Sequence, residues 1–256
     1  MRLALFFHLT RAAWLDRYAA SALGMGWAVL WPLVQLGIFL LVFGELMGAR
    51  LEGAAPLGKF SYGVYLASGM AAWGVLAGGI GKACGVFLDQ RGLLTKIALP
   101  LAWVIVPQLL AESLGSLLLL GFLSLGLASL GKLSANALWL VAVVPGMGLL
   151  VYGAGLILAV LTVFLEDLRE LVQIGLQLGF WLTPVVYVAA ILPDWAQTLL
   201  AINPAAWAVE AFHAVLVFGR PPAFEALAAL WGGGLVLTGL GLWLCQRLEK
   251  AIRDLL

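Results

Sequence analysis

Runs of apolar residues close to twenty in length dominate this sequence, and they constrain its fold more than any other feature. A helix of about 20 residues crosses the hydrocarbon core of a bilayer. Of the 256 residues, 64% are hydrophobic and 11% are charged, whereas a soluble domain carries about 25% charged residues. A transmembrane β-barrel would instead show alternating segments of about ten residues. We therefore predict an all-α integral membrane protein, in which each span satisfies its own backbone hydrogen bonds.

The apolar runs predict one membrane domain over residues 1–256 with six transmembrane helices. The predicted spans are 25–48, 61–81, 101–127, 137–162, 171–190 and 225–245. Glycines recur in and after the second span at steps of three or four residues, at Gly74, Gly78, Gly81 and Gly85. Small residues at this spacing let two helices approach closely.

Charged or broken segments flank the predicted spans. Residues 1–22 form an imperfectly amphipathic helix, which we expect to lie in the membrane interface. Residues 82–100 interrupt the hydrophobicity, and 86–99 can form one short helix that would suit docking into a groove of a soluble partner. An ordinary interfacial loop is the alternative. Hydropathy would allow a span before 220, but Pro204 disfavours helical geometry in the preceding residue, so we predict two short re-entrant helices over 193–220.

Lysine and arginine residues predict the orientation in the membrane. If six spans leave both ends in the cytoplasm, the cytoplasmic segments hold ten basic residues and the outer segments hold four. The cytoplasmic set is Arg2, Arg11, Arg17, Lys82, Arg91, Lys96, Arg169, Arg247, Lys250 and Arg253, and the outer set is Arg50, Lys59, Lys132 and Arg220. We therefore expect a multi-pass protein with both termini in the cytoplasm.

Motifs for chemistry are scarce. The stretch 126–133 nearly spells a phosphate-binding loop, but Leu133 replaces the Ser or Thr that would hold magnesium, and no strand precedes it. Glu45 and Glu112 are the acids inside or near the ends of spans. We interpret Glu112 as a partner in helix packing rather than a proton carrier, although an ionisable residue inside a membrane is a functional hypothesis by default. This shortage argues against a proton-driven transporter and against a membrane-embedded enzyme.

Aromatic residues along the fifth predicted span are a candidate path for sugars. Phe180, Trp181 and Tyr187 lie on this span or beside its proline break. Aromatic faces suit the passage of sugars, whose C–H faces stack on rings. Lipid-facing or packing aromatics are the alternative interpretation.

Seven short patterns follow one another along the chain. They are Tyr18-x-x-Ser21-x-Leu23-Gly24-x-x-Trp27-x-x-Leu30-x-Pro32, Tyr65-Leu66-x-Ser68-Gly69, Gly92-Leu93-Leu94-x-Lys96-x-x-x-Pro100, Asp167-Leu168, Trp181-x-Thr183-Pro184-x-x-Tyr187, Leu192-Pro193 and Asn203-Pro204. On these patterns, in this order, the chain resembles the transmembrane subunits of ABC-2-type exporters, and it is most similar to the permeases that export O-antigen polysaccharide.

The resemblance implies partners and a cargo. Two copies of the chain would pair with two copies of a separate ABC ATPase, which would bind ATP and magnesium, while this chain would bind no cofactor and would not itself be an enzyme. A polyprenyl-diphosphate-linked polysaccharide would cross the bacterial inner membrane between the two copies, in lipopolysaccharide biosynthesis. Capsular polysaccharide, teichoic acid or a drug are alternative cargoes, and a membrane-embedded glycan or lipid enzyme is a more distant alternative. Membrane lipids, but not nucleic acid, are expected partners.

The resemblance also implies roles for residues of this chain. A coupling helix within 82–100 would contact the ATPase through Asp89, Gln90, Arg91, Leu93, Leu94 and Lys96. The entry from the interface helix into the first span would involve Arg17, Tyr18, Gly24 and Trp27. Candidates for the glycan channel and for gate helices at the periplasmic face are Phe180, Trp181, Tyr187, Asn203, Pro204, Trp207 and His213. His213 stands where related chains often have Arg, so any contact with glycan or pyrophosphate there would depend on protonation of the ring.

Overall fold

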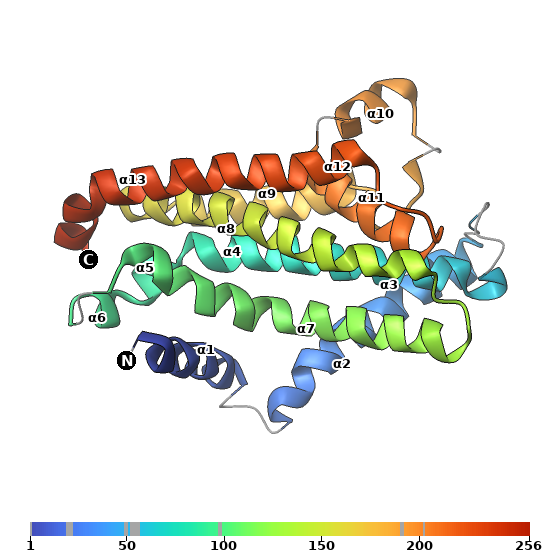
Figure 1. The fold of residues 1–256 in the computed structure, drawn as a ribbon, viewed down its shortest axis with the longest axis horizontal. Coiled ribbons are helices and arrows are strands. Elements are labelled where there is room, and N and C mark those ends of the chain that lie inside the picture. Colours follow the sequence, from blue (N-terminus) through green and yellow to red (C-terminus); the bar gives the residue numbers. More distant parts are fainter. Residues whose placement is uncertain are drawn as a thin grey trace.

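The structure, a computed structural model, describes residues 2–18, 23–48, 51, 57–96, 99–189, 192–201 and 203–256. In these ranges the chain forms helices and no strand, which confirms the predicted all-α fold. Figure 1 shows an elongated bundle in which both termini lie at the same end. We call this the terminal end and the opposite one the distal end.

Five helical segments in the described ranges are long and apolar enough to cross a membrane. They are Trp27–Leu46 (α2, Trp27–Phe39, with η2, Leu40–Leu46), Ser61–Cys84 (α3, Ser61–Trp73; η4, Gly74–Gly78; α4, Gly79–Cys84), Leu101–Ser129 (α7), Ala135–Phe164 (η5, Ala135–Trp139, with α8, Leu140–Phe164) and Phe224–Leu255 (α12, Phe224–Ala228; η7, Ala229–Gly233; α13, Gly234–Leu255). The chain is therefore a multi-pass membrane protein.

The helix α9, Leu168–Leu182, occupies the place of the predicted fifth span but is not among these five. Its 15 residues reach about 22 Å at 1.5 Å per residue, which is less than the roughly 30 Å of a hydrocarbon core. It ends before the predicted boundary at 190, because Thr183 precedes Pro184 and adopts an extended conformation. The count of six spans stays a prediction.

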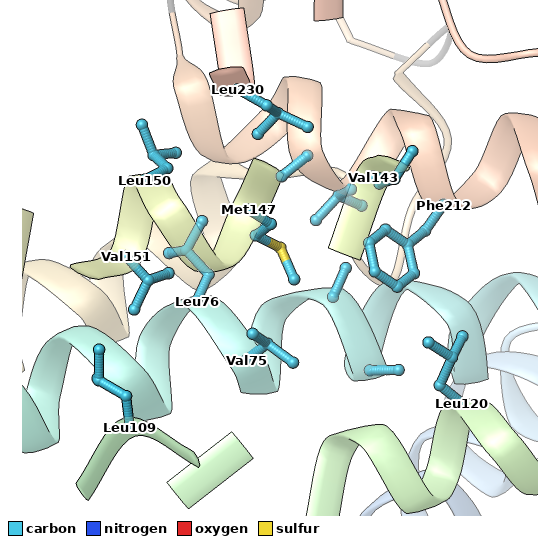
Figure 2. Packing of buried hydrophobic residues seen from close by; sticks show 14 of the residues in the cluster. Val75, Leu76, Leu109, Leu120, Val143, Met147, Leu150, Val151, Phe212 and Leu230 are labelled. Carbon is cyan, nitrogen blue, oxygen red and sulfur yellow. The ribbon is translucent and has the colours of Figure 1, made fainter. Parts of the chain in front are cut away.

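The second spanning segment, α3 to α4, runs through the centre of the bundle, and 67% of its most apolar window is buried. Figure 2 shows Val75 and Leu76 of this segment among side chains of α7, α8 and η7. The helix α11, Pro204–Leu216, adds Phe212 to the same core. Val75, Leu76 and Phe212 are each at most 5% exposed, so this central segment is the frame on which the outer helices pack.

The glycine series in and after the second span lies where other helices approach. A Cβ atom on Gly74 would overlap Ser116 of α7, and one on Gly78 would lie 3.2 Å from the Glu112 carboxylate of the same helix. Further along, Gly81 and Gly85 face Gln173 and Arg169 of α9. These contacts confirm the predicted close approach and show that one glycine series serves two neighbours, α7 and α9.

The terminal end gathers four elements close to the two chain ends (Figure 1). They are α1 (Arg2–Tyr18), α5 (Val86–Asp89), α6 (Arg91–Leu94) and the last turns of α13. The helix α1 packs against α7, and its location at a membrane interface stays a prediction. The prediction of one helix over 86–99 is wrong, because Gln90 (φ −103°, ψ 15°) separates two single-turn helices and α6 ends at Leu94.

The segment between α9 and α12 forms two short helices. These are α10, Asp194–Ala201, and α11, which begins directly after Asn203. Pro204 takes the first position of α11, where a missing N–H costs nothing. The helical structure is thus interrupted at the predicted Asn203-Pro204 pair. The role of the two helices as a gate stays a prediction.

Candidate functional site

A cavity of about 550 Å³ lies between α2, the central segment and α9. Its lining residues are Gln35, Phe39, Trp73, Ala77, Gly78, Gln173, Leu176, Gln177, Phe180 and Trp181. We call it the aromatic cavity. Phe180 is its centre, since its ring stacks on Phe39 at 5.6 Å and meets Trp73 edge-on at 5.8 Å and Trp181 at 5.3 Å between ring centroids.

Trp73 reaches into this cavity because α9 has a glycine opposite it. The tip of the Trp73 ring would lie 3.1 Å from a Cβ atom on Gly179. Two candidates from the sequence, Phe180 and Trp181, therefore belong to one aromatic cluster with Phe39 and Trp73. Three glutamines, Gln35, Gln173 and Gln177, are exposed on the walls of the same cavity. Rings and amides on one wall can contact both the C–H faces and the hydroxyls of a sugar.

At the distal end, two tyrosines of α3 hold the turn that follows α9. The Tyr65 hydroxyl lies 3.1 Å from the Pro184 carbonyl and 2.7 Å from the Tyr187 carbonyl, and it can donate to either. The Tyr62 hydroxyl donates to the Val186 carbonyl at 2.9 Å. These bonds satisfy backbone groups of an irregular turn that is otherwise buried, where an unpaired carbonyl would be costly.

The same turn is tied to α11 by Asn203. Its side-chain oxygen caps α11 by accepting the Ala205 N–H at 3.0 Å, and its amide nitrogen donates to the Thr183 hydroxyl at 3.2 Å. Three of the family patterns from the sequence, around Tyr65, Thr183 and Asn203, thus meet in one place. We call this group, Tyr62, Tyr65, 183–187, Asn203 and His213, the distal network.

His213 belongs to the distal network rather than to an exposed gate surface. It is 3% exposed, its ring stacks on Tyr65 at 3.7 Å between centroids, and its Nε2 donates to the Tyr65 carbonyl at 3.1 Å. Burial lowers the pKa of His213 far below its usual range, so the ring is neutral at physiological pH. Protonation therefore does not supply the positive charge of an arginine at this position.

A second cavity, of about 370 Å³, lies beside the distal network. Trp207 and Glu210 of α11 line it together with Arg220, whose guanidinium lies 5.2 Å from the centre of the Phe218 ring. The remaining gate candidates are structural in this arrangement: Tyr187 donates to the Trp181 carbonyl at 3.0 Å, and Pro204 begins α11.

At the terminal end, Asp89 bridges two basic residues from different helices. Its carboxylate lies 3.1 Å from Lys82 of α4 and 3.2 Å from Arg169 of α9. The Arg169 guanidinium lies directly over Gly85, where a Cβ atom would be 2.9 Å from its central carbon. We call Lys82, Asp89 and Arg169 the terminal ion-pair cluster. It joins the predicted coupling segment to the first turn of the helix that lines the aromatic cavity.

The C-terminal helix holds the other end of the coupling segment. Arg253 donates to the Leu94 carbonyl at 3.3 Å and to the Leu99 carbonyl at 2.7 Å, and it pairs with Glu249 at 2.8 Å. The Leu94 side chain is 3% exposed and packs in the core. Leu94 therefore packs in the core in this structure, and its contact with an ATPase stays a prediction.

The other predicted ATPase contacts differ in exposure. Arg91 and Lys96 are exposed, and Gln90 and Leu93 are half-buried. Asp89 faces the terminal ion-pair cluster, with 28% of its side chain exposed. The surface that α5 and α6 offer is thus basic, with Arg91 and Lys96 as its outward charges.

The predicted entry into the first span is partly described. Arg17 and Tyr18 form the end of α1, and their side chains lie outside the described residues, as do residues 19–22. Gly24 has φ +51°, a left-handed conformation that favours glycine. Trp27 begins α2 and is 38% exposed. The backbone therefore turns at this glycine just before α2 begins, and its role in the entry stays a prediction.

The near match to a phosphate-binding loop is the end of a membrane helix. Residues 126–129 form the last turn of α7. Lys132 donates to the Leu57 carbonyl at 3.1 Å and lies 5.5 Å from the centre of the Phe60 ring. Its ammonium group thus fastens the loop before α3 at the distal end.

Sequence reasoning missed three sets of residues that the structure brings into these sites. The glutamines of the aromatic cavity were detectable, since Gln173 and Gln177 stand one helical turn apart in an apolar run. Tyr62 and Arg253 gave no such signal, because their partners are backbone carbonyls 124 and 154 to 159 residues away.

The sequence also matches a known family and several curated proteins. The family model described as ABC-2 type transporter matches residues 4–217. The chain belongs to this family, and it is thus a membrane component of a transporter.

Curated relatives match nearly the whole chain. An O-antigen export system permease protein RfbA of Klebsiella pneumoniae is 23% identical over 242 residues, which cover 94% of this chain and 90% of the relative. A protein of the same name from Myxococcus xanthus is 28% identical over 246 residues, covering 93% of this chain and 88% of the relative.

Proposed function

We propose that this chain is the permease subunit of an ABC exporter that moves a polyprenyl-diphosphate-linked polysaccharide of the O-antigen type across the bacterial inner membrane. The observation that carries the proposal is the aromatic cavity, which four aromatic rings and three amides line from α2, the central segment and α9. Relatives named as O-antigen export permeases, matched over more than nine-tenths of this chain, support the cargo class.

The channel forms between two copies of the chain. Ala28 is the one buried residue of α2, and α9 has none, among the side chains that the structure describes. One face of α9 exposes Leu171, Ile174, Leu178 and Leu182, each between 55% and 65%. A second copy related by two-fold symmetry would cover such a face and double the walls of the aromatic cavity.

Energy comes from a separate ABC ATPase that docks at the terminal end. Arg91 and Lys96 are the exposed basic residues of α6 and its following turn, and they suit an acidic groove on the partner. The double variant Arg91→Glu with Lys96→Glu should leave ATP hydrolysis by the partner running while export falls. Unchanged export would contradict the docking role, and correct membrane insertion of the variant is the control.

In this proposal the terminal end faces the cytoplasm, and α10 and α11 form the gate at the periplasmic face. The excess of Lys and Arg in the segments of the terminal end supports this orientation. A cysteine at Lys96 should react with an impermeant thiol reagent only in inside-out vesicles, and one at Lys132 only in intact spheroplasts. The reverse pattern would invert the topology.

The cargo is tested by export in cells. Deleting the gene should remove polysaccharide from the cell surface and leave lipid-linked polymer inside, and the wild-type chain should restore export. Phe180→Leu should restore it poorly, since the stacking ring is lost, whereas Phe224→Leu should restore it fully, because Phe224 is 80% exposed and outside the cavity. Equal export by the two variants would show that the polysaccharide does not pass through the aromatic cavity.

A further inference from the structure

The aromatic cavity is polar but uncharged. Among the residues that the structure describes, none that lines this cavity is Asp, Glu, Lys, Arg or His. The sequence agrees, since no Lys or Arg occurs between Arg17 and Arg50, between Lys59 and Lys82, or between Arg169 and Arg220. The three helical segments that form the walls therefore carry Lys or Arg only near their terminal ends, at Lys82 and Arg169, and neither residue lines the cavity.

The three glutamines show that this neutrality is not that of a lipid-facing surface. Gln35 is exposed within the apolar helix α2, and Gln173 and Gln177 are exposed on α9, about one and two turns after Arg169. An amide facing hydrocarbon without a partner costs about 2–7 kcal/mol. Exposed amides on these helices are therefore expected where the hydroxyl groups of a passing glycan reach them.

We propose that the aromatic cavity selects uncharged, hydroxyl-rich glycan units and rejects polyanionic ones, such as polymers with uronic acids or phosphodiesters in every repeat. This inference rests on the proposed function and narrows its cargo. Sugar C–H faces stack on Phe180, Trp73 and Trp181. Hydroxyls exchange hydrogen bonds with the glutamine amides, which both donate and accept.

A negative charge would meet a penalty at the same place. An ion that leaves water for a membrane interior needs a partner of opposite charge, and the effective cost without one is several kcal/mol. A two-fold related copy would contribute the same uncharged side chains, so the second wall offers no cation either. The diphosphate of the carrier lipid crosses once per polymer, whereas every repeat unit passes the cavity. The uncharged lining therefore suits the charge of the repeat unit rather than that of the carrier lipid.

The test compares two cargoes in proteoliposomes that hold the chain with its partner ATPase. The cargoes are polyprenyl-diphosphate-linked polymers of equal length, one a neutral mannan and one with a glucuronate in every repeat. Wild-type protein should translocate the anionic polymer at least about tenfold more slowly than the mannan. Equal rates, or a faster anionic polymer, would overturn the inference and leave the proposed function intact. Failure to move either polymer, with ATPase activity present, would count against the proposed function itself.

Charge variants then locate the selectivity. Gln177→Lys should raise transport of the anionic polymer and lower that of the mannan, and Gln35→Lys should act in the same direction from the opposite wall. Gln246→Lys adds the same charge on an exposed position of α13, outside the cavity, and should leave the ratio of the two rates unchanged. If neither cavity variant shifts the ratio while both insert and support ATP hydrolysis, the selectivity does not reside in the aromatic cavity.

Discussion

At the distal end, Tyr62, Tyr65 and Asn203 join α3, the turn after α9 and α11 by neutral hydrogen bonds, whereas at the terminal end Asp89 joins α4, α5 and α9 by charges. The distal groups are largely buried, and Thr183 has no exposed surface. The side chains of the terminal ion-pair cluster are 28% to 45% exposed. The two ends of α9 are thus held in different environments by different chemistry.

The contacts at the two ends of α9 differ in how much free energy is needed to break them. Buried neutral hydrogen bonds are expensive to break, because each partner left unpaired costs about 1–3 kcal/mol. Exposed ion pairs contribute about 0–1 kcal/mol and weaken with salt. The distal network therefore fixes the position of α9, while the terminal cluster is a joint that can transmit or release movement. Four substitutions test this division.

The largest effect is expected from Gly69→Ala, on α3 beside the distal network. The new Cβ atom would lie 2.8 Å from the Val185 carbonyl oxygen and 2.9 Å from His213 Nε2, so the turn after α9 must shift. Overpacking of this kind costs about 1–3 kcal/mol. Thermal unfolding of the detergent-solubilised protein measures the loss. Gly121→Ala is the matched control, since no atom lies within 4 Å of its Cβ position, and a similar loss there would refute the explanation.

The next effect is expected from Tyr65→Phe. The ring stays stacked on His213, but the hydroxyl that donates to the Tyr187 carbonyl at 2.7 Å, or to that of Pro184, is lost, so we expect about 1–2 kcal/mol less stability. Tyr62→Phe removes one bond, to Val186, and should cost less. If the two variants unfold at the temperature of the wild type, the distal network does not stabilise the fold.

A smaller effect is expected from Arg253→Gln. The side chain is 30% exposed and bonds two carbonyls of the coupling segment, so its removal should cost about 1 kcal/mol. Protease cleavage within 94–100 should also become faster, because the segment loses this attachment. Arg247→Gln, an exposed position one to two turns earlier in α13, is the control. Equal protease sensitivity of the two variants would speak against the attachment.

The smallest effect on stability is expected from Asp89→Asn. It removes both ion pairs of the terminal cluster, yet their partial exposure limits the loss to less than about 1 kcal/mol. Raising the salt concentration to about 1 M should shrink the difference from wild type further. A loss as large as that of Gly69→Ala would show that the two ends do not differ as described.

The sequence predicted well what depends on local pattern. Long apolar runs predicted the helical fold, and Pro204 predicted the break before α11. Each of these follows from the residue or the run itself, independently of the rest of the molecule.

Tertiary contacts could not be predicted in the same way. The hydrogen bonds of Tyr65 reach 119 and 122 residues along the chain, and nothing in the local pattern names those partners. The family resemblance assigns Leu94 to the ATPase contact, but its side chain is buried in the core. The expected coupling helix is interrupted at Gln90, directly after Asp89. The two partners of Asp89 are also distant in sequence, since Lys82 lies seven residues before Asp89 and Arg169 lies 80 residues after it.

The most direct test of coupling through the terminal ion-pair cluster is a charge exchange between Asp89 and Arg169, in proteoliposomes that contain the chain and its partner ATPase. The measured quantity is polysaccharide exported per ATP hydrolysed. Asp89→Arg and Arg169→Asp should each lower this ratio strongly, with ATP hydrolysis continuing, and the double variant should recover much of it because the pair is restored in reverse. A double variant no better than either single variant would contradict the claim that the terminal end couples ATP hydrolysis to α9 and the aromatic cavity.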